Sequence, residues 1–438
     1  MKIVRKRRRS RLRRWLAPTA NLARAVGMAV AGLVMRLLGV FMSFRLVLRP
    51  LFDGIGAGWD GTLGALGMDS RQVTHLLGGA VMLAGGLFVY RGLRSFFRQL
   101  NSASDSKRTL VAGYLKRQQL AQGPRIVVLG GGTGLSTLLR GLKQYSSNIT
   151  AVVTVTDDGG SSGRLSQEMG ILPPGDLRNC LVALADAERL MTDLFQHRFS
   201  GGSGSLSGHS IGNLLIAGFL EQTGGDVDRA LALASEVLNI RGRVIPSTSQ
   251  TVRLRALMED SEEICGETAI VSSGKRVRRI YLDPPQVIAH PQAIEAIREA
   301  DLICIGPGSV YTSVVPNLLV PGIAGAIEES DAVKVYVCNV MTQRGESDQF
   351  TAAEHVVALQ ANVPGRVMDY VLVNTATPSQ AVLDRYHDSG QDFVVPDQDR
   401  IKQMGYRPIA GNLINETDLV RHDPMRMAAR LMDILQRA

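Results

Sequence analysis

The chain has 438 residues, of which 45% are hydrophobic and 5% aromatic, and a formal net charge of +9 at pH 7. The charge is uneven: residues 1–14 carry nine basic side chains and no acidic one, whereas residues 122–438 carry 28 basic against 36 acidic side chains. A nucleic-acid enzyme shows its basic stripe on the fold itself, so this distribution excludes nucleic acid as the expected partner. The basic tail is better suited to anionic lipid head groups.

Two apolar segments follow the tail, at 25–44 and 75–90. Cations flank them on the outside and three aspartates lie in the loop between them, which by the positive-inside rule predicts a transmembrane hairpin with both flanks in the cytoplasm. The expected location is therefore the cell membrane, with the main domain cytoplasmic. Helices lying in the membrane plane are an alternative, and "RRWLA" at 13–17 superficially resembles an export signal.

Three parts are predicted in chain order: 1–100 with the tail and the hairpin, a polar linker over 101–123, and a main domain over 124–438. In the main domain short, continuous apolar runs alternate with helical periods, which predicts an α/β fold: a Rossmann-like, doubly wound, mostly parallel sheet. The expected strands are 125–129, 149–155, 301–305, 333–338 and 370–374, and the expected helices are 136–144, 176–191, 211–222 and 226–239. Residues 243–282 alternate apolar with polar side chains and predict a small β insertion. The four cysteines are widely spaced and are expected to be small buried residues.

The first candidate motif is the turn Gly130-Gly131-Gly132-Thr133-Gly134, which follows the first strand. Glycines allow backbone N–H groups to approach a phosphate, and the helix expected to start near Leu135 directs its positive end at it. The alternative is a tight strand-to-helix turn without a ligand.

The second motif, from Asp157 to Arg164, follows the second strand and includes Asp158, Gly159, Ser161 and Ser162. An acid at this point of a dinucleotide fold contacts ribose hydroxyls. Two adjacent carboxylates could instead hold Mg²⁺ against phosphate oxygens. Both roles stay open.

The third motif is "LPPGDLRN" at 172–179, in which Asp176 is expected to cap the following helix. Capping leaves Arg178 and Asn179 free to address an anion.

Three further polar stretches follow strands or open helices. They contribute His209, Ser210 and Asn213, then Gly306, Gly308 and Ser309, and finally Asn339, Thr342 and Gln343. Since ligands of such folds bind beyond the carboxyl ends of the strands, these loops predict one polar crevice for a nucleotide-bearing ligand.

The segments "GGGTGLSTLLRGLK", "TVTDDGGSSGRL", "GILPPGDLRNCL", "GHSIGNLLIA", "IGPGSVYTSVVPNLLV" and "CNVMTQRGES", with "RHDP" near the end, occur in this order. Together they resemble the YvcK-type gluconeogenesis factors, relatives of the CofD phospholactate transferases. The resemblance covers about 124–438 and leaves the first 120 residues outside. It implies binding of a UDP-sugar such as UDP-N-acetylglucosamine, and a role in cell shape and cell-wall synthesis during gluconeogenic growth.

Three function classes remain open. A non-catalytic UDP-sugar sensor needs no cofactor, and the sequence presents no activated nucleophile. A phospholactate-transferase-like enzyme would use Mg²⁺ held by Asp157 and Asp158, although "GGSSGRL" departs from the transferase pattern. An NAD-dependent oxidoreductase is suggested by the fold alone. Besides the sugar nucleotide and the membrane, the expected partners are cell-wall synthesis proteins and further copies of the chain.

Overall fold

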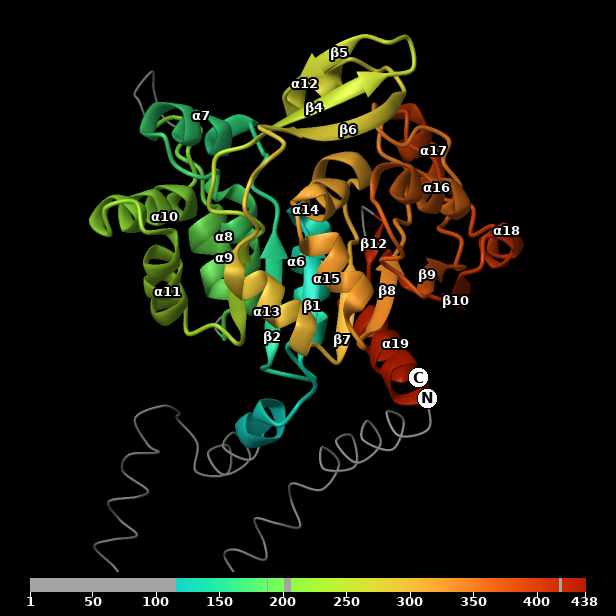
Figure 1. Ribbon diagram of the computed structural model, residues 1–438, viewed down its shortest axis with the longest axis horizontal. Coiled ribbons are helices and arrows are strands. Elements are labelled where there is room, and N and C mark those ends of the chain that lie inside the picture. Colours follow the sequence, from blue (N-terminus) through green and yellow to red (C-terminus); the bar gives the residue numbers. More distant parts are fainter. Residues whose placement is uncertain (1–115, 187, 201–205, 417–419) are drawn as a thin grey trace, which may run out of the picture. The chain divides into compact units, whose positions relative to one another are not determined.

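A seven-stranded sheet, parallel throughout, forms the centre of the protein (Figure 1). The computed structural model describes residues 116–438 except 187, 201–205 and 417–419. All five predicted strands are present, and the α/β, Rossmann-like architecture is confirmed. The strands are β1 (Ile126–Gly130), β2 (Ile149–Val153), β3 (Arg243–Pro246), β7 (Leu302–Ile305), β8 (Val333–Val337), β9 (Tyr370–Asn374) and β10 (Arg407–Gly411).

The strand order β10-β9-β8-β7-β1-β2-β3 reverses direction between β1 and β7. From β1 the chain builds outward through β2 to β3, then returns to β7 and builds the other way. Such a reversal leaves room between two diverging loops at the carboxyl ends of the strands. It therefore fixes where a ligand site is expected.

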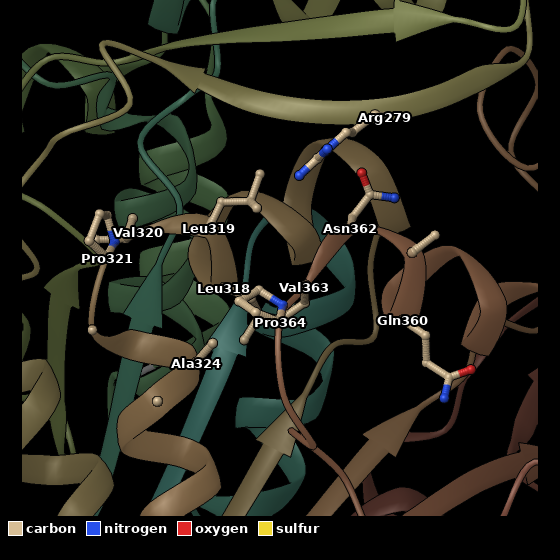
Figure 2. Close-up of a pocket in the computed structure, with 13 residues that line it drawn as sticks. Arg279, Leu318, Leu319, Val320, Pro321, Ala324, Gln360, Asn362, Val363 and Pro364 are labelled. Carbon is tan, nitrogen blue, oxygen red and sulfur yellow. The ribbon is translucent and has the colours of Figure 1, made fainter.

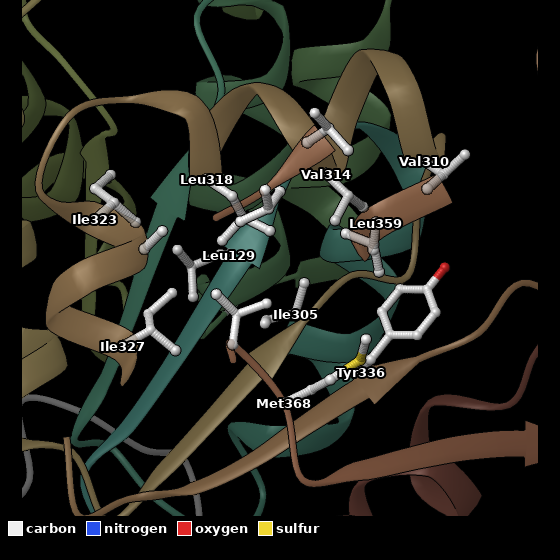
Figure 3. Packing of buried hydrophobic residues seen from close by; sticks show 14 of the residues in the cluster. Leu129, Ile305, Val310, Val314, Leu318, Ile323, Ile327, Tyr336, Leu359 and Met368 are labelled. Atoms are coloured by element: carbon white, nitrogen blue, oxygen red, sulfur yellow. The ribbon is translucent and has the colours of Figure 1, made fainter. Parts of the chain in front are cut away.

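Side chains of β1 alternate between two cores, one on each face of the sheet. Ile126 and Val128 pack on the first face, under α6 (Gly132–Leu142), α8 (Pro174–Leu184), α9 (Glu188–Gln196), α10 (Ile211–Gln222), α11 (Val227–Leu238) and α19 (Pro424–Arg437). Val127 and Leu129 pack on the second face, under α13 (Pro291–Glu299), the π-helix η2 (Val310–Val314), α14 (Val315–Leu319), α15 (Ile323–Glu329), α16 (Ala352–Asn362) and α18 (Gln398–Gln403). Figure 3 shows Leu129 meeting residues of η2, α14 and α15 in this second core.

The predicted helix 176–191 is in fact two helices, α8 and α9. Ala185 ends α8 in an extended conformation and pairs with Ile240 in an isolated bridge. This tertiary pairing interrupts a segment whose apolar period alone is continuous.

The β insertion is present but begins later than predicted, because Arg243–Pro246 is strand β3 of the parallel sheet. The insertion is an antiparallel sheet of β4 (Arg253–Met258), β5 (Glu263–Cys265) and β6 (Val277–Asp283) with helix α12 (Glu267–Ser272). Figure 1 shows it beyond the carboxyl ends of β1 and β2. Cys265 is exposed on β5, contrary to the expectation that every cysteine is buried.

The remaining elements lie around these layers: α7 (Gly160–Met169), α17 (Gln380–Asp388), and the pair β11 (Ile414–Glu416) and β12 (Val420–His422). The predicted membrane hairpin lies outside the described residues, as does the linker up to residue 115. Within the described part, no single helix has the length and apolarity to cross a membrane. One pair bent by 78°, Val310–Leu319 with Ile323–Glu329, passes by length and composition together, and both members belong to the buried core.

Candidate functional site

The loops that follow β1, β2, β7 and β8 meet at one edge of the sheet, on both sides of the reversal in strand order. We call this region the strand-end site. It comprises 130–134, 157–164, 306–309 and 339–347, together with the first turns of α8 and α10 that pack against them. The predicted motif loops are thus brought together by the fold.

Neighbouring loops pack closely against the glycine turn at 130–134. A Cβ atom on Gly131 would lie 2.4 Å from Oδ2 of Asp176, and one on Gly134 would lie 2.4 Å from the carbonyl oxygen of Pro307. Gly132 has φ +64°, and α6 begins there, three residues before the predicted start near Leu135. Close packing of the adjoining loops therefore explains the glycines at 131 and 134 without a ligand.

Asp176 does not cap its own helix, contrary to the prediction. Pro173 is the N-cap of α8 and provides no side-chain hydrogen bond. The carboxylate of Asp176 instead faces the start of α6, where the nearby backbone N–H of Gly132 favours its charged form. Burial and the nearby charge of Asp157 raise the pKa of Asp176 to about 6. An internal carboxylate thus lies against the predicted phosphate turn.

A buried hydrogen-bond network connects three of the predicted motifs. Nη1 of Arg178 donates to Oγ of Ser210 at 2.6 Å and to Oδ1 of Asn213 at 2.9 Å. Nδ2 of Asn213 donates to Oγ of Ser161 at 3.0 Å, and Ser161 lies 3.0 Å from Nδ1 of His209. Burial lowers the pKa of His209. The network makes this side of the site a pre-organised wall.

Arg178 is therefore not free to address an anion, contrary to the prediction. It is 7% exposed, and its Nη2 donates to Oδ1 of Asn179 at 2.9 Å. Only its Nε lacks a hydrogen-bond partner among the described residues. The guanidinium sits beside Asp176, whose pKa it lowers, so its charge is partly used inside the protein.

The loop after β2 is held by hydrogen bonds within itself and to neighbouring segments. Oδ1 of Asp157 accepts the N–H of Gly159 at 2.9 Å, and Oγ of Ser162 accepts the N–H of Gly175 at 3.0 Å. Arg164 is exposed and donates to the carbonyl oxygen of Ser207 at 2.8 Å.

Asp158 reaches the insertion. Its Oδ1 accepts the N–H of Thr268 at 2.9 Å and the hydroxyl of Thr268 at 2.7 Å, at the start of α12. Helix α12 of the insertion is therefore hydrogen-bonded to Asp158, one member of the predicted acidic pair.

Glu267, also at the start of α12, was missed from the sequence. Burial and the charges of Asp157, Asp176, Glu346 and Asp158 raise its pKa to about 9. No local motif marks Glu267, because its proximity to the loop after β2 depends on how the insertion docks.

On the other side of the reversal, the loops after β7 and β8 are joined by a reciprocal pair. The N–H of Gly308 donates to Oδ1 of Asn339 at 3.1 Å, and Nδ2 of Asn339 donates back to the carbonyl oxygen of Gly308 at 2.9 Å. Nδ2 of Asn339 also lies 3.4 Å from Oε1 of Gln343. The carbonyl oxygen of Ser309 accepts the N–H groups of Ser313 and Val314, the last two residues of η2. Thr342 exchanges two hydrogen bonds with the backbone of Asp392, a structural role.

Glu346, in the loop after β8, is a further buried acid of the strand-end site. It is 5% exposed, its Oε1 accepts the hydroxyl of Thr312 at 2.6 Å, and its Oε2 has no partner among the described residues. Burial raises its pKa to about 7. Such carboxyl groups retain protons near neutral pH and can donate a hydrogen bond.

Asp157 and Asp158 remain the predicted metal pair. Within the described part of the chain, no group of three or more His, Cys, Asp or Glu side chains is arranged to hold a metal ion. Both carboxylates already accept hydrogen bonds from protein groups. A magnesium ion at this point would need ligand or water oxygens to complete its coordination.

Comparison with known proteins identifies the family of the chain. The family model described as 2-phospho-L-lactate transferase CofD matches residues 126–414. The gluconeogenesis factor of Bacillus subtilis is 47% identical over 72% of this chain and 100% of its own length. A crystal structure of a UPF0052 family member from Bacillus halodurans, 47% identical, superimposes with a TM-score of 0.68 over 70% of this chain and 99% of that one.

A putative gluconeogenesis factor of Nostoc sp. is 44% identical over 96% of this chain and 91% of its own length. The likeness thus extends into the first 120 residues, which the sequence motifs had left outside. With the model matched over most of the main domain and relatives matched over nearly their whole length, the chain belongs to the CofD family and is a homologue of the gluconeogenesis factors.

Proposed function

We propose that the main domain is a sensor that binds a UDP-sugar, such as UDP-N-acetylglucosamine, at the strand-end site and releases it unchanged. In this arrangement the glycine turn faces the diphosphate with backbone N–H groups, and the Gly306–Ser309 loop lies beside it. Asp157 accepts ribose hydroxyls, and Asn339 and Gln343 address the remaining polar groups. The expected role is in cell shape and cell-wall synthesis during gluconeogenic growth.

The observation that carries this proposal is the convergence of four motif loops at the reversal between β1 and β7. Ligands of open α/β sheets bind at this position. The polar side chains on the β2 side are bonded to one another, as expected of a wall that orients a ligand.

The test is titration calorimetry of the full chain with UDP-N-acetylglucosamine, with and without Mg²⁺. We expect saturable binding, and mass analysis after several hours should recover the ligand intact. Asp157→Asn should weaken binding about tenfold, as expected for the loss of a charged hydrogen-bond acceptor. Asp193→Asn, an exposed carboxyl on α9, is the matched control and should leave affinity unchanged. Absence of binding to the wild type would overturn the proposal.

A phospholactate-transferase-like activity is the second candidate, favoured by the family model. Asp157 and Asp158 would then hold Mg²⁺, and phosphoryl chemistry needs positioning more than a protein nucleophile. A transferred phospho-group in the mass analysis, dependent on Mg²⁺, would favour this function over the sensor.

We further propose that residues 1–100 anchor the main domain to the cell membrane, through the basic tail and the apolar segments. The proposed protein partners are cell-wall synthesis proteins and further copies of the chain. Membrane fractionation of the full chain and of a variant starting at 120 tests the anchor. The shorter variant should become soluble and keep its affinity for the UDP-sugar.

A further inference from the structure

A pocket of about 420 Å³ lies away from the strand-end site and shares no residue with it (Figure 2). It is formed where α14 ends and turns into α15, beside the end of α16 and beneath β6. Its volume falls within the range of about 300–1,000 Å³ that small-molecule sites occupy. The apolar part of its lining is Leu318, Leu319, Val320, Pro321, Val363 and Pro364.

One charged side chain lines the pocket, that of Arg279 on β6. Figure 2 shows its guanidinium extending from the strand toward Leu319 and Asn362. Arg279 is exposed, and in the described part of the chain its side chain makes no hydrogen bond or ion pair to another residue. Elsewhere in the insertion, Arg255 and Lys275 do pair with acids, Asp283 and Asp260.

The amide groups of the two other polar side chains of the lining already take part in hydrogen bonds. Oδ1 of Asn362 accepts the N–H of Ile280 at 2.7 Å, and its Nδ2 donates to the carbonyl oxygen of Ala358 at 2.8 Å. Nε2 of Gln360 donates to the hydroxyl of Tyr406 at 2.9 Å. Arg279 is thus the lining side chain that offers charged donors to an incoming molecule.

We propose that this pocket binds a small aliphatic carboxylate, whose carboxyl group pairs with Arg279 and whose hydrocarbon chain covers the apolar lining. A planar guanidinium matches a carboxylate through two parallel hydrogen bonds. The apolar lining favours a hydrocarbon body, because burying it removes apolar surface from water. Both ends of the ligand therefore have a counterpart in the pocket.

The first test is a calorimetric titration of the full chain with hexanoate. We expect saturable binding that Arg279→Gln weakens about tenfold or more, in line with the loss of a charge-assisted pair. Arg278→Gln is the matched control, because Arg278 is the adjacent exposed arginine of β6 and does not line the pocket. It should change affinity less than about twofold, as expected for a screened surface charge.

The second test fills the pocket. Gly325 on α15 lines it, and a Cβ there would meet nothing within 4 Å, so Gly325→Leu should fold and abolish hexanoate binding. Gly218→Leu on α10 is the control, since that glycine is equally open and lies elsewhere. Both changes favour the helix, so their stability effects should be alike.

Three results would overturn the proposal: no saturable binding of hexanoate by the wild type, equal losses in the Arg278 and Arg279 variants, or equally tight binding of hexylamine. The UDP-sugar titration separates the two sites. Arg279→Gln should leave UDP-N-acetylglucosamine binding unchanged, so failure at either site is visible independently of the other.

Discussion

The two sides of the strand-end site are built differently. On the β2 side, formed by 157–164 and the first turns of α8 and α10, buried polar side chains bond to one another around Arg178. On the β8 side, formed by 306–309 and 339–347, backbone segments approach closely and Glu346 keeps one oxygen without a partner in the described region. The first side holds its shape through a network of buried side chains, and the second through close backbone approaches and the reciprocal bonds between Asn339 and Gly308.

The largest effect is expected from Arg178→Met, which removes the centre of the hydrogen-bond network on the β2 side. The change leaves the amide of Asn213 and the hydroxyl of Ser210 short of a buried partner, which should lower the free energy of unfolding by about 4 kcal/mol. Urea denaturation followed by circular dichroism measures it. Arg298→Met, at an exposed position of α13, should change stability by less than about 0.5 kcal/mol. Equal effects would show that the network carries no stability.

On the β8 side, Glu346→Gln should change how the free energy of unfolding depends on pH. The buried acid keeps its proton up to a pKa of about 7, whereas the unfolded chain loses it near the ordinary value of 4.5. The free energy of unfolding therefore falls as pH rises between these values. The amide variant lacks this fall and should gain up to about 3 kcal/mol relative to the wild type between pH 4.5 and 8. Parallel pH profiles for the two proteins would contradict it, and Glu236→Gln on α11 serves as the exposed control.

Gly134→Ala tests whether the glycine turn is required by packing. Its Cβ would meet the carbonyl oxygen of Pro307 at 2.4 Å, so the loops after β1 and β7 must separate. We expect a loss of about 2 kcal/mol and impaired UDP-sugar binding. Gly218→Ala, where nothing lies within 4 Å of the new atom, should instead be neutral or slightly stabilising.

The smallest effect is expected at the contact between Asp158 and Thr268. If Asp158 acts by holding α12, Asp158→Asn and Thr268→Val should each weaken UDP-sugar binding by about 1 kcal/mol, and the double variant no further. Calorimetric titration of the three proteins measures this coupling. Additive losses would mean that Asp158 addresses the ligand directly.

The sequence predicts the centre of the fold well and its margins poorly. β1, β2, β7, β8 and β9 are nearly continuous apolar runs because most of their residues are covered on both faces. The edge strands β3 and β10 carry Arg243, Arg407 and Pro408, so their composition resembles that of a loop. Edge strands need less apolar surface, and only pairing with a neighbour identifies them.

In the candidate site, too, some features could be predicted from the sequence and others could not. Its loops are predictable, since strand ends and glycines are local signals. The partners of individual side chains are not: Asp176 lies against the glycine turn rather than capping its own helix, and Glu267 comes from the insertion. Those contacts depend on how distant segments dock, which no local spacing encodes.

The pairing of β1 with β7 also bears on how the chain folds. It joins Ile126 to Leu302, and the final helix α19 packs on α6, where a Cβ on Gly141 would strike the carbonyl oxygen of Pro424. Contacts between such distant segments close large loops, which slows folding. During synthesis the open edge of β1 and the bare face of α6 stay exposed until the last third of the chain emerges, a period in which chaperone binding would protect the nascent chain from aggregation.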